Sequence, residues 1–141
     1  MKTMENEFVP YELAVKLKAI GFDEPCFGCY DDKAVFGLTV MSIKQYYTNS
    51  KEDTWNCAAP LYQQAFRWFR EKYNLRGFIG FRPNVKQFDY HVYDMSLSGK
   101  EYVKQRTMKD YNKDSLVGTY EEAELACLEK LIEIVKHGEH K

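Results

Sequence analysis

The stretch from Thr119 to Gly138 has the most regular pattern in the sequence and constrains the fold most strongly. Thr119 and Glu122 have the spacing of a capping box, in which each side chain satisfies a backbone N–H at a helix start. Apolar residues at helical spacing follow, and they are Cys127, Leu128, Leu131, Ile132 and Val135. Gly138 is predicted to end the helix. A helix with one apolar face has to bury that face against another element.

Two other stretches are predicted to be helical. The first begins at Pro10, whose fixed φ suits a first helical turn, and ends at Gly21. Its apolar stripe consists of Leu13, Leu17 and Ile20. The second opens at Pro60, and its core-facing stripe is Tyr62, Ala65, Phe66, Phe69 and Tyr73. The opposite stripe is polar and consists of Gln63, Arg67, Arg70 and Asn74.

Short segments of β type fill the intervals between these helices. They cover residues 26–30, 34–40, 54–57, 77–81 and 88–97, with 43–47 as a further segment. A polar turn at 31–33 separates the first pair, and another is predicted at 98–100. In the last segment the apolar parity shifts between Val92 and Tyr93, which predicts a bulge. Residues 102–118 are predicted to form a loop with one irregular strand.

The predicted order is therefore α-β-β-(β)-α-β-β-α. Strands in pairs joined by short turns indicate antiparallel pairing. We expect an α+β fold, in which one antiparallel sheet of about four to five strands carries three helices. With 141 residues, 16% of them aromatic, the chain has enough apolar surface for a single globular domain spanning 1–141, with short flexible ends at 1–7 and 138–141.

Several classes of protein are disfavoured by composition. No apolar run approaches the ~18–20 residues that a bilayer requires, so no membrane association is expected. The first residues lack the apolar segment of a secretory signal. Four cysteines are too few for a disulfide framework. These observations predict a cytoplasmic protein with free thiols.

Charge is unevenly distributed along the chain. Residues 61–110 contain 10 Lys and Arg and 5 Asp and Glu, a formal charge of +5. Residues 1–60 and 111–141 each have a formal charge of −3, from 6 against 9 and from 4 against 7. The basic middle either attracts a polyanion or is neutralised by the acidic segments in the fold.

A candidate binding site follows from this basic segment. Its members are Gln63, Arg67, Trp68, Arg70, Arg76 and Arg82. Several cations on one surface neutralise phosphates, and an indole stacks on a base. The alternative interpretation is a solvated helix face whose cations pair with the acidic helices.

Two further patterns bear on catalysis and metals. Cys26 and Cys29 form a C-x-x-C, but the pair follows a helix instead of opening one, and a zinc site needs two more ligands. Strand parity places Asp89, His91 and Tyr93 on one face, where His91 has the surroundings of a general base. No nucleophile motif accompanies it. We therefore predict structural cysteines and no catalytic residue, metal or cofactor.

Three long stretches occur in one order: FVPYELAVKLKAIGFDEPCFG, APLYQQAFRWFREKYNL and TYEEAELACLEKLIEIVK. Together they resemble a family of small proteins that bacteriophages and prophages encode, whose activity is not established. The resemblance spans most of the chain but not residues 31–56 and 77–118. It implies a phage or mobile-element origin and the bacterial host cytoplasm as the working place, and no catalytic or cofactor role.

The surplus of aromatic residues, eleven of them tyrosines, favours an aromatic contact surface. The leading hypothesis is a non-enzymatic accessory protein that binds another protein or itself. The first alternative is a small nucleic-acid-binding protein that uses the basic face of the second helix. A further alternative is a metal-binding or enzymatic domain built on Cys26, Cys29 and His91.

Overall fold

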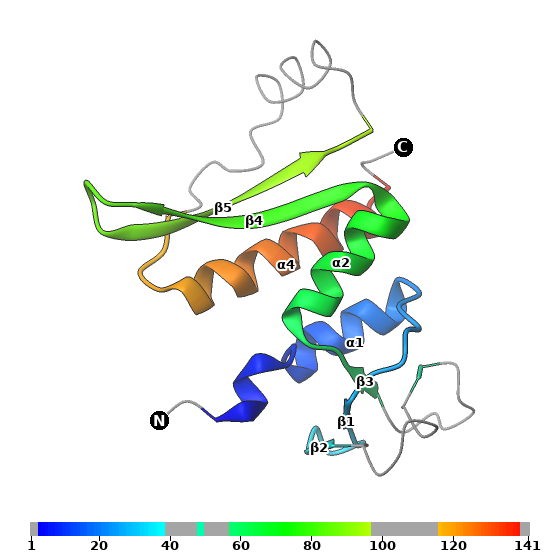
Figure 1. Ribbon diagram of the computed structural model, residues 1–141. Helices are drawn as coiled ribbons and strands as arrows, with labels where there is room; N and C mark the ends of the chain where they lie inside the picture. Colours follow the sequence, from blue (N-terminus) through cyan, green and yellow to red (C-terminus); the bar gives the residue numbers. More distant parts are fainter. Residues whose placement is uncertain (1–2, 39–47, 50–56, 97–115, 139–141) are drawn as a thin grey trace. The chain divides into compact units, whose positions relative to one another are not determined.

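The computed structural model describes residues 3–38, 48–49, 57–96 and 116–138 (Figure 1). Among these residues the elements follow one another in the predicted order of helices and strands. The α+β class and the antiparallel pairing are both confirmed. The chain divides into two compact units, Met1–Ala65 and Phe66–Lys141. The prediction of a single domain stays a prediction.

The first unit opens with a 3-10 helix, η1 (Met4–Glu7), in the end that was expected to be flexible. The helix α1 (Tyr11–Ala19) follows, with Pro10 at its N-cap. The two leucines of the predicted stripe, Leu13 and Leu17, are buried. Ile20 lies just past the helix and is half-buried.

The end of α1 is closed by a glycine-dependent cap. Gly21 has a φ of 96°, a left-handed conformation that glycine adopts without strain. This conformation lets the N–H of Phe22 donate to the Leu17 carbonyl at 3.0 Å and the N–H of Gly21 donate to the Lys18 carbonyl at 3.1 Å. These two bonds define a Schellman motif. The Phe22 side chain then lies in the core of the unit.

Three short strands form the sheet of the first unit. They are β1 (Gly28–Tyr30), β2 (Phe36–Leu38) and β3 (Cys57–Ala59), in the order β2-β1-β3 and antiparallel throughout. The predicted turn after β1 is present, because the Asp31 carboxylate accepts hydrogen bonds from the backbone N–H groups of Lys33 and Val35.

The chain before α1 is fastened to the chain after β3. Phe8 pairs with Leu61 in an isolated antiparallel bridge, and the N–H of Val9 donates to the Pro60 carbonyl at 2.8 Å. The hydroxyl of Tyr30 donates to the Val9 carbonyl at 2.7 Å. Burial raises the pKa of this phenol to about 12, so it remains a donor at any ordinary pH.

The helix α2 (Tyr62–Tyr73) contains the boundary between the two units. Its core-facing residues Ala65, Phe66 and Phe69 are buried as predicted. Its opposite stripe is exposed at all four predicted positions, which are Gln63, Arg67, Arg70 and Asn74.

The second unit consists of a long hairpin packed on a helix. The strands β4 (Leu75–Arg82) and β5 (Gln87–Asp94) pair over their whole length, from Leu75 with Asp94 to Arg82 with Gln87. The helix α4 (Tyr120–Lys136) packs against both strands. Thr119 caps it, since its hydroxyl accepts from the N–H of Glu122 at 3.1 Å.

Two sequence predictions for this unit need correction. The bulge between Val92 and Tyr93 is wrong, because the pairing runs unbroken through both residues. Val92 faces α4 while Tyr93 lies on the opposite face, so apolar side chains simply occupy both faces of the strand. The buried face of α4 includes Ile134, and Val135 is only half-buried.

The prediction of one sheet is also wrong. The five strands among the described residues form two sheets, one of three strands and one of two. Each hairpin follows from local turns, whereas the assignment of hairpins to one sheet or two depends on long-range packing that a local pattern does not encode. The predicted features at 43–47 and 98–100 lie outside the described residues.

One observation bears on membranes. In the part of the chain that the structure describes, no helix combines the length and the apolar composition needed to cross a bilayer.

Candidate functional site

The β4–β5 hairpin has two faces with different surroundings. A Cβ atom on Gly77 would meet Cys127 Sγ and Leu131 Cδ1, so the odd-numbered residues of β4 face α4. The even-numbered residues and their cross-strand partners therefore lie on the other face. We call this surface the strand face, and it consists of Arg76, Phe78, Gly80, Arg82, Gln87, Asp89, His91 and Tyr93.

Three aromatic rings on the strand face are nearly parallel. The centroid of the Phe78 ring lies 4.9 Å from that of His91 and 5.4 Å from that of Tyr93, with interplanar angles of 20° and 12°. The His91 and Tyr93 rings are 6.2 Å apart at 9°. The guanidinium carbon of Arg76 lies 5.9 Å from the Phe78 centroid, within cation–π range. The three parallel rings form a compact group, in which each ring centroid lies within 6.2 Å of the other two, and the guanidinium of Arg76 lies over the Phe78 ring.

A buried carboxylate lies beside this group of rings. Arg82 Nε donates to Asp89 Oδ2 at 2.7 Å, and His91 Nε2 lies 3.2 Å from Asp89 Oδ1. Gly80 is the cross-strand partner of Asp89, and a Cβ on Gly80 would meet the Asp89 carboxylate. Glycine at this position therefore leaves the room that the carboxylate occupies.

Two opposing effects set the pKa of Asp89. Burial alone would raise the pKa, but the hydrogen bond from Arg82 and the charges of His91 and Arg82 outweigh burial. The pKa of Asp89 is therefore lowered, and the carboxylate is ionised at neutral pH. Sequence parity placed Asp89, His91 and Tyr93 on one face, which the strand register confirms. Neither Arg82 as the partner of Asp89 nor Gly80 beneath it was foreseen.

This arrangement is poorly suited to general-base catalysis. One nitrogen of His91 faces Asp89, and the other, Nδ1, is buried and has no hydrogen-bond partner among the described residues. A base has to reach the proton it removes, directly or through one water. A buried Nδ1 offers no such access.

The lowered pKa of Asp89 makes stability sensitive to acid. Because the carboxyl binds its proton less readily in the folded state, its contribution is present above the unfolded pKa of ~3.9 and is lost as pH falls through the folded value. In Asp89→Asn, we expect the free energy of unfolding to decline less steeply than in the unsubstituted protein below about pH 4. Urea denaturation at several pH values measures this difference. Identical acid limbs in the two proteins would contradict the ion pair.

The six residues of the predicted binding site are not brought to one surface. Gln63, Arg67 and Arg70 lie on the exposed face of α2. Arg76 and Arg82 lie on the strand face, where Arg82 is already paired with Asp89. The predicted basic stripe is thus divided between a helix and a strand.

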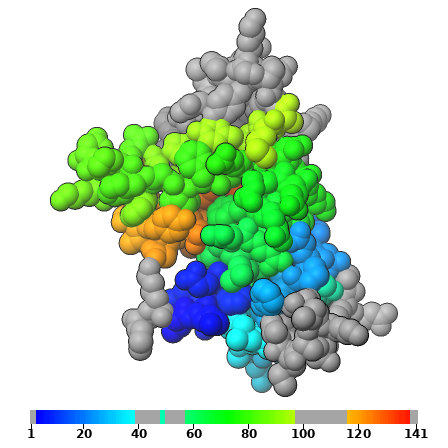
Figure 2. Space-filling model, viewed as in Figure 1, coloured from blue at the N-terminus to red at the C-terminus, as the bar shows by residue number. Residues whose placement is uncertain are grey.

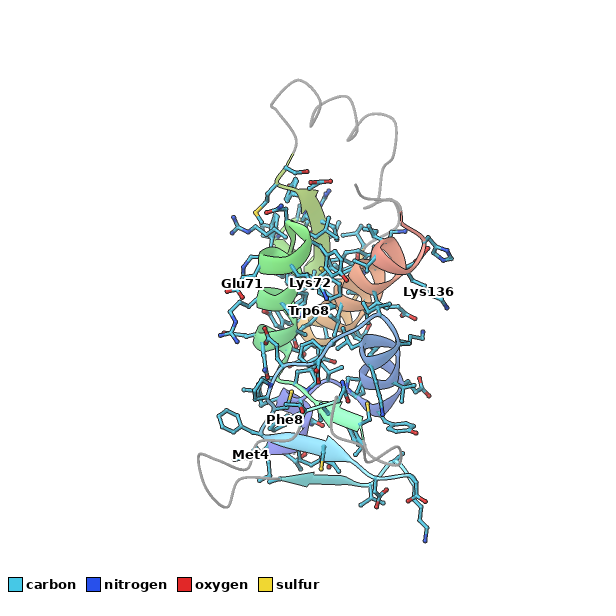
Figure 3. All side chains as sticks on the ribbon, turned by 90° about the vertical axis from the view of Figure 1, so that its right-hand side faces the viewer. Met4, Phe8, Trp68, Glu71, Lys72 and Lys136 are labelled. Carbon is cyan, nitrogen blue, oxygen red and sulfur yellow. The ribbon has the colours of Figure 1, made fainter. Side chains whose placement is uncertain are left out.

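Trp68 requires a correction. Only 5% of this residue is exposed, and its ring makes edge contacts with Phe69 and Tyr73. Lys72, one turn further along α2, lies 5.2 Å from the indole centroid (Figure 3). An indole buried in this way has no face on which a base could stack, so Trp68 does not belong to a binding surface.

The cysteines are structural in their surroundings. All four are free thiols, and Cys26, Cys57 and Cys127 are buried. Burial raises the pKa of Cys26 and Cys127 to about 12 and that of Cys57 to about 11. Cys29 is half-buried and its pKa is also raised, first by burial. Nucleophilic and redox chemistry need the thiolate, which these raised pKa values disfavour.

The burial of the thiols predicts that they react slowly with thiol reagents. At pH 8 we expect an aromatic disulfide reagent to modify Cys29 first and the three buried thiols at least tenfold more slowly. After unfolding in urea, all four thiols should react together. Rapid modification of Cys26 in the folded protein would contradict its burial.

The metal alternative gains no structural support. Among the described residues, no group of three or more His, Cys, Asp or Glu side chains is close enough to hold a metal ion.

The closed end of the hairpin carries an exposed apolar surface. The strands extend past the first turn of α4, so the helix does not cover their ends (Figures 1 and 2). We call this surface the tip patch, and it consists of Phe81, Val85, Phe88, Leu116 and Tyr120. Apart from the half-buried Phe88, these residues are between 44 and 54% exposed.

Ring contacts join the three aromatic residues of the tip patch. The Phe81 and Phe88 centroids are 5.0 Å apart, and those of Phe88 and Tyr120 are 5.9 Å apart. Phe88 also forms a backbone bridge with Val117, which holds the neighbouring Leu116 near the hairpin. The sequence placed these residues in separate elements, so periodicity gave no signal for the patch.

Comparisons with known proteins leave the function to be argued from this geometry. No family model matches the chain, and no curated protein or solved structure shows significant similarity to it. The resemblance to phage-encoded proteins stays a prediction.

Proposed function

We propose that this protein is a non-enzymatic accessory protein that acts by binding a partner protein through the tip patch. The supporting observation is the continuous exposed surface of Phe81, Phe88 and Tyr120 at the end of the hairpin. Scattered exposed apolar residues are common on protein surfaces, whereas contiguous large ones mark interaction sites.

The composition of the patch fits this role. Aromatic residues are enriched in the centres of protein interfaces and charged residues in their rims. Exposed polar side chains surround the turn of the hairpin at Arg82, Asn84 and Lys86. An aromatic centre with a polar rim therefore lies at one end of the second unit.

The proposal also covers the origin of the protein and the cellular compartment in which it acts. A phage or mobile-element origin and the bacterial cytoplasm remain part of it, on the strength of the sequence resemblance. Free thiols at all four cysteines are compatible with a reducing compartment. The partner is either another protein or a second copy of this chain, bound through the same patch.

The experiment uses the unsubstituted protein, Phe81→Ser and Val35→Ser. Each serves as bait in a pull-down from the native host, and the Kd of the purified complex is then measured. The unsubstituted protein should form a saturable complex with one partner from its native host, or with itself. Phe81→Ser should weaken that complex by ~2 kcal/mol, about thirtyfold in Kd, because Phe81 is the most exposed ring of the patch. Val35→Ser, at a similarly exposed apolar residue of the first unit, should leave the Kd unchanged.

The contrary results are equally definite. If the purified protein is monomeric at high concentration and gives no saturable complex, the proposal is wrong. If Phe81→Ser and Val35→Ser bind equally well, a partner exists but does not use the tip patch.

A further inference from the structure

We propose that the strand face is a binding surface for single-stranded nucleic acid. The strand face lies on the side of the β4–β5 sheet opposite α4 and shares no residue with the tip patch. The proposal moves nucleic-acid contact from α2, where the sequence pattern suggested it, to β4 and β5. Its central residues are Phe78, Arg76 and Arg82.

The strand face presents a group of ordered aromatic rings. Phe78, His91 and Tyr93 are parallel to within 20°, and Phe78 is 36% exposed. An unpaired base stacks on aromatic rings whatever its identity, because every base has a π-face. A base that contacted the exposed part of Phe78 would meet a ring that His91 and Tyr93 already hold in place, which reduces the entropy cost of binding.

Two arginines lie on the same face of the hairpin as the rings. Arg76 lies beside Phe78, and Arg82 lies six residues further along the same strand, about 20 Å away at the usual rise per residue. Both side chains project on the face that carries the rings. Arg76 is therefore placed to meet a phosphate next to a base on Phe78. Arg82 is placed to meet a phosphate several nucleotides further along, since its Nε donates to Asp89 but its side chain is 56% exposed.

The two sides of the β4–β5 sheet differ in charge. The helix that covers the other face, α4, has exposed carboxylates at Glu121, Glu122, Glu129 and Glu133. A polyanion is repelled from that side and attracted to the side of the two arginines. Asp89 offsets the charge of Arg82 but not that of Arg76, so the charged side chains of the strand face sum to one positive charge when His91 is neutral.

Single strands are favoured over duplexes by the same geometry. Bases in a duplex are stacked on one another and do not offer a face to a protein ring. A duplex would meet only the two arginines of this surface. We therefore expect fluorescein-labelled 12-nucleotide RNA and DNA of mixed sequence to bind more tightly than the corresponding duplex.

The test is fluorescence anisotropy of these labelled strands with the full chain. We expect Kd to rise roughly tenfold between 50 and 200 mM salt, as for two or three phosphate contacts. Phe78→Leu keeps an apolar side chain but removes the ring, and it should weaken binding tenfold or more. Phe78→Trp should retain binding. Arg76→Glu should weaken it at least tenfold.

The matched control is Arg70→Glu, which makes the same change of charge on α2. It should alter Kd less than threefold. An equal loss with Arg70→Glu and Arg76→Glu would place the contact elsewhere and overturn the proposal. So would tighter binding of duplex than of single strands, undiminished binding by Phe78→Leu, or no binding at 50 mM salt. A protein complex that Phe78→Leu abolishes, without oligonucleotide binding, would also overturn it.

Discussion

Replacing Gly77 by valine is expected to lower the free energy of unfolding of the second unit by about 3 kcal/mol. A Cβ atom at this position would lie 2.7 Å from Cys127 Sγ, 3.0 Å from Leu131 Cδ1 and 3.3 Å from Phe66 Cε1. These neighbours are buried and cannot all withdraw, so the added side chain would push β4 away from α4. Urea denaturation followed by circular dichroism measures the loss.

A second substitution shows whether the clash is the cause. Gly77→Ala with Cys127→Ala removes the closest neighbour, so the double variant should be more stable than the sum of the single effects predicts, by about 1 kcal/mol. Gly37→Ala is the control, because a Cβ there meets nothing within 4 Å. If Gly77→Ala were as mild as Gly37→Ala, the close packing of β4 on α4 would be disproved.

The largest effect in the first unit is expected from Phe22→Ala. This side chain is 1% exposed, and its backbone N–H completes the cap of α1. Removing a fully buried aromatic ring costs about 3–5 kcal/mol, because the ring loses its burial and leaves a cavity. We expect a loss of that size in urea denaturation and faster amide exchange along α1.

Phe27 provides the comparison for Phe22. It is 44% exposed, so Phe27→Ala should cost less than about 1 kcal/mol. Equal effects of the two substitutions would mean that Phe22 does not lie in a packed core. The Phe22 carbonyl also accepts a hydrogen bond from Asn49 Nδ2 at 2.7 Å, and Asn49 Oδ1 accepts from the Ala58 N–H, so amide exchange at Ala58 should rise as well.

The helices were predictable because their signals are local. Pro10 and Gly21 define the limits of α1, and Thr119 with Glu122 defines the start of α4. Each signal acts through backbone groups within one turn, so no knowledge of the rest of the fold is required. The turn at Asp31 was predictable for the same reason.

The arrangement of the strands was not predictable in the same way. Aromatic residues lie on both faces of β5, so the parity rule read a bulge where the pairing is regular. The alternation rule assumes that one face of the strand is buried and apolar and the other is solvent-exposed and polar. This assumption fails on β5, where tyrosine and histidine rings lie on the face opposite α4. The division into two sheets depends on contacts between distant residues.

The site was foreseen in part. Parity placed Asp89, His91 and Tyr93 together, because side chains two residues apart share a face. Their cross-strand neighbours, Phe78 and Arg82, depend on the register of the hairpin, which the sequence of either strand alone does not specify. Trp68 was misplaced because it lies between the two stripes of α2, where helical periodicity is ambiguous.

The fastening of Phe8 and Val9 to Pro60 and Leu61 has a practical consequence for anyone who shortens this chain. Residues 3–7 are all exposed, so a deletion that ends before Phe8 leaves the described core residues in place, whereas one that includes Val9 also takes away the acceptor of the Tyr30 hydroxyl. Shortened versions should therefore tolerate the loss of residues 1–7 and fail abruptly two residues later, which a series of stepwise deletions would reveal as a sharp fall in yield.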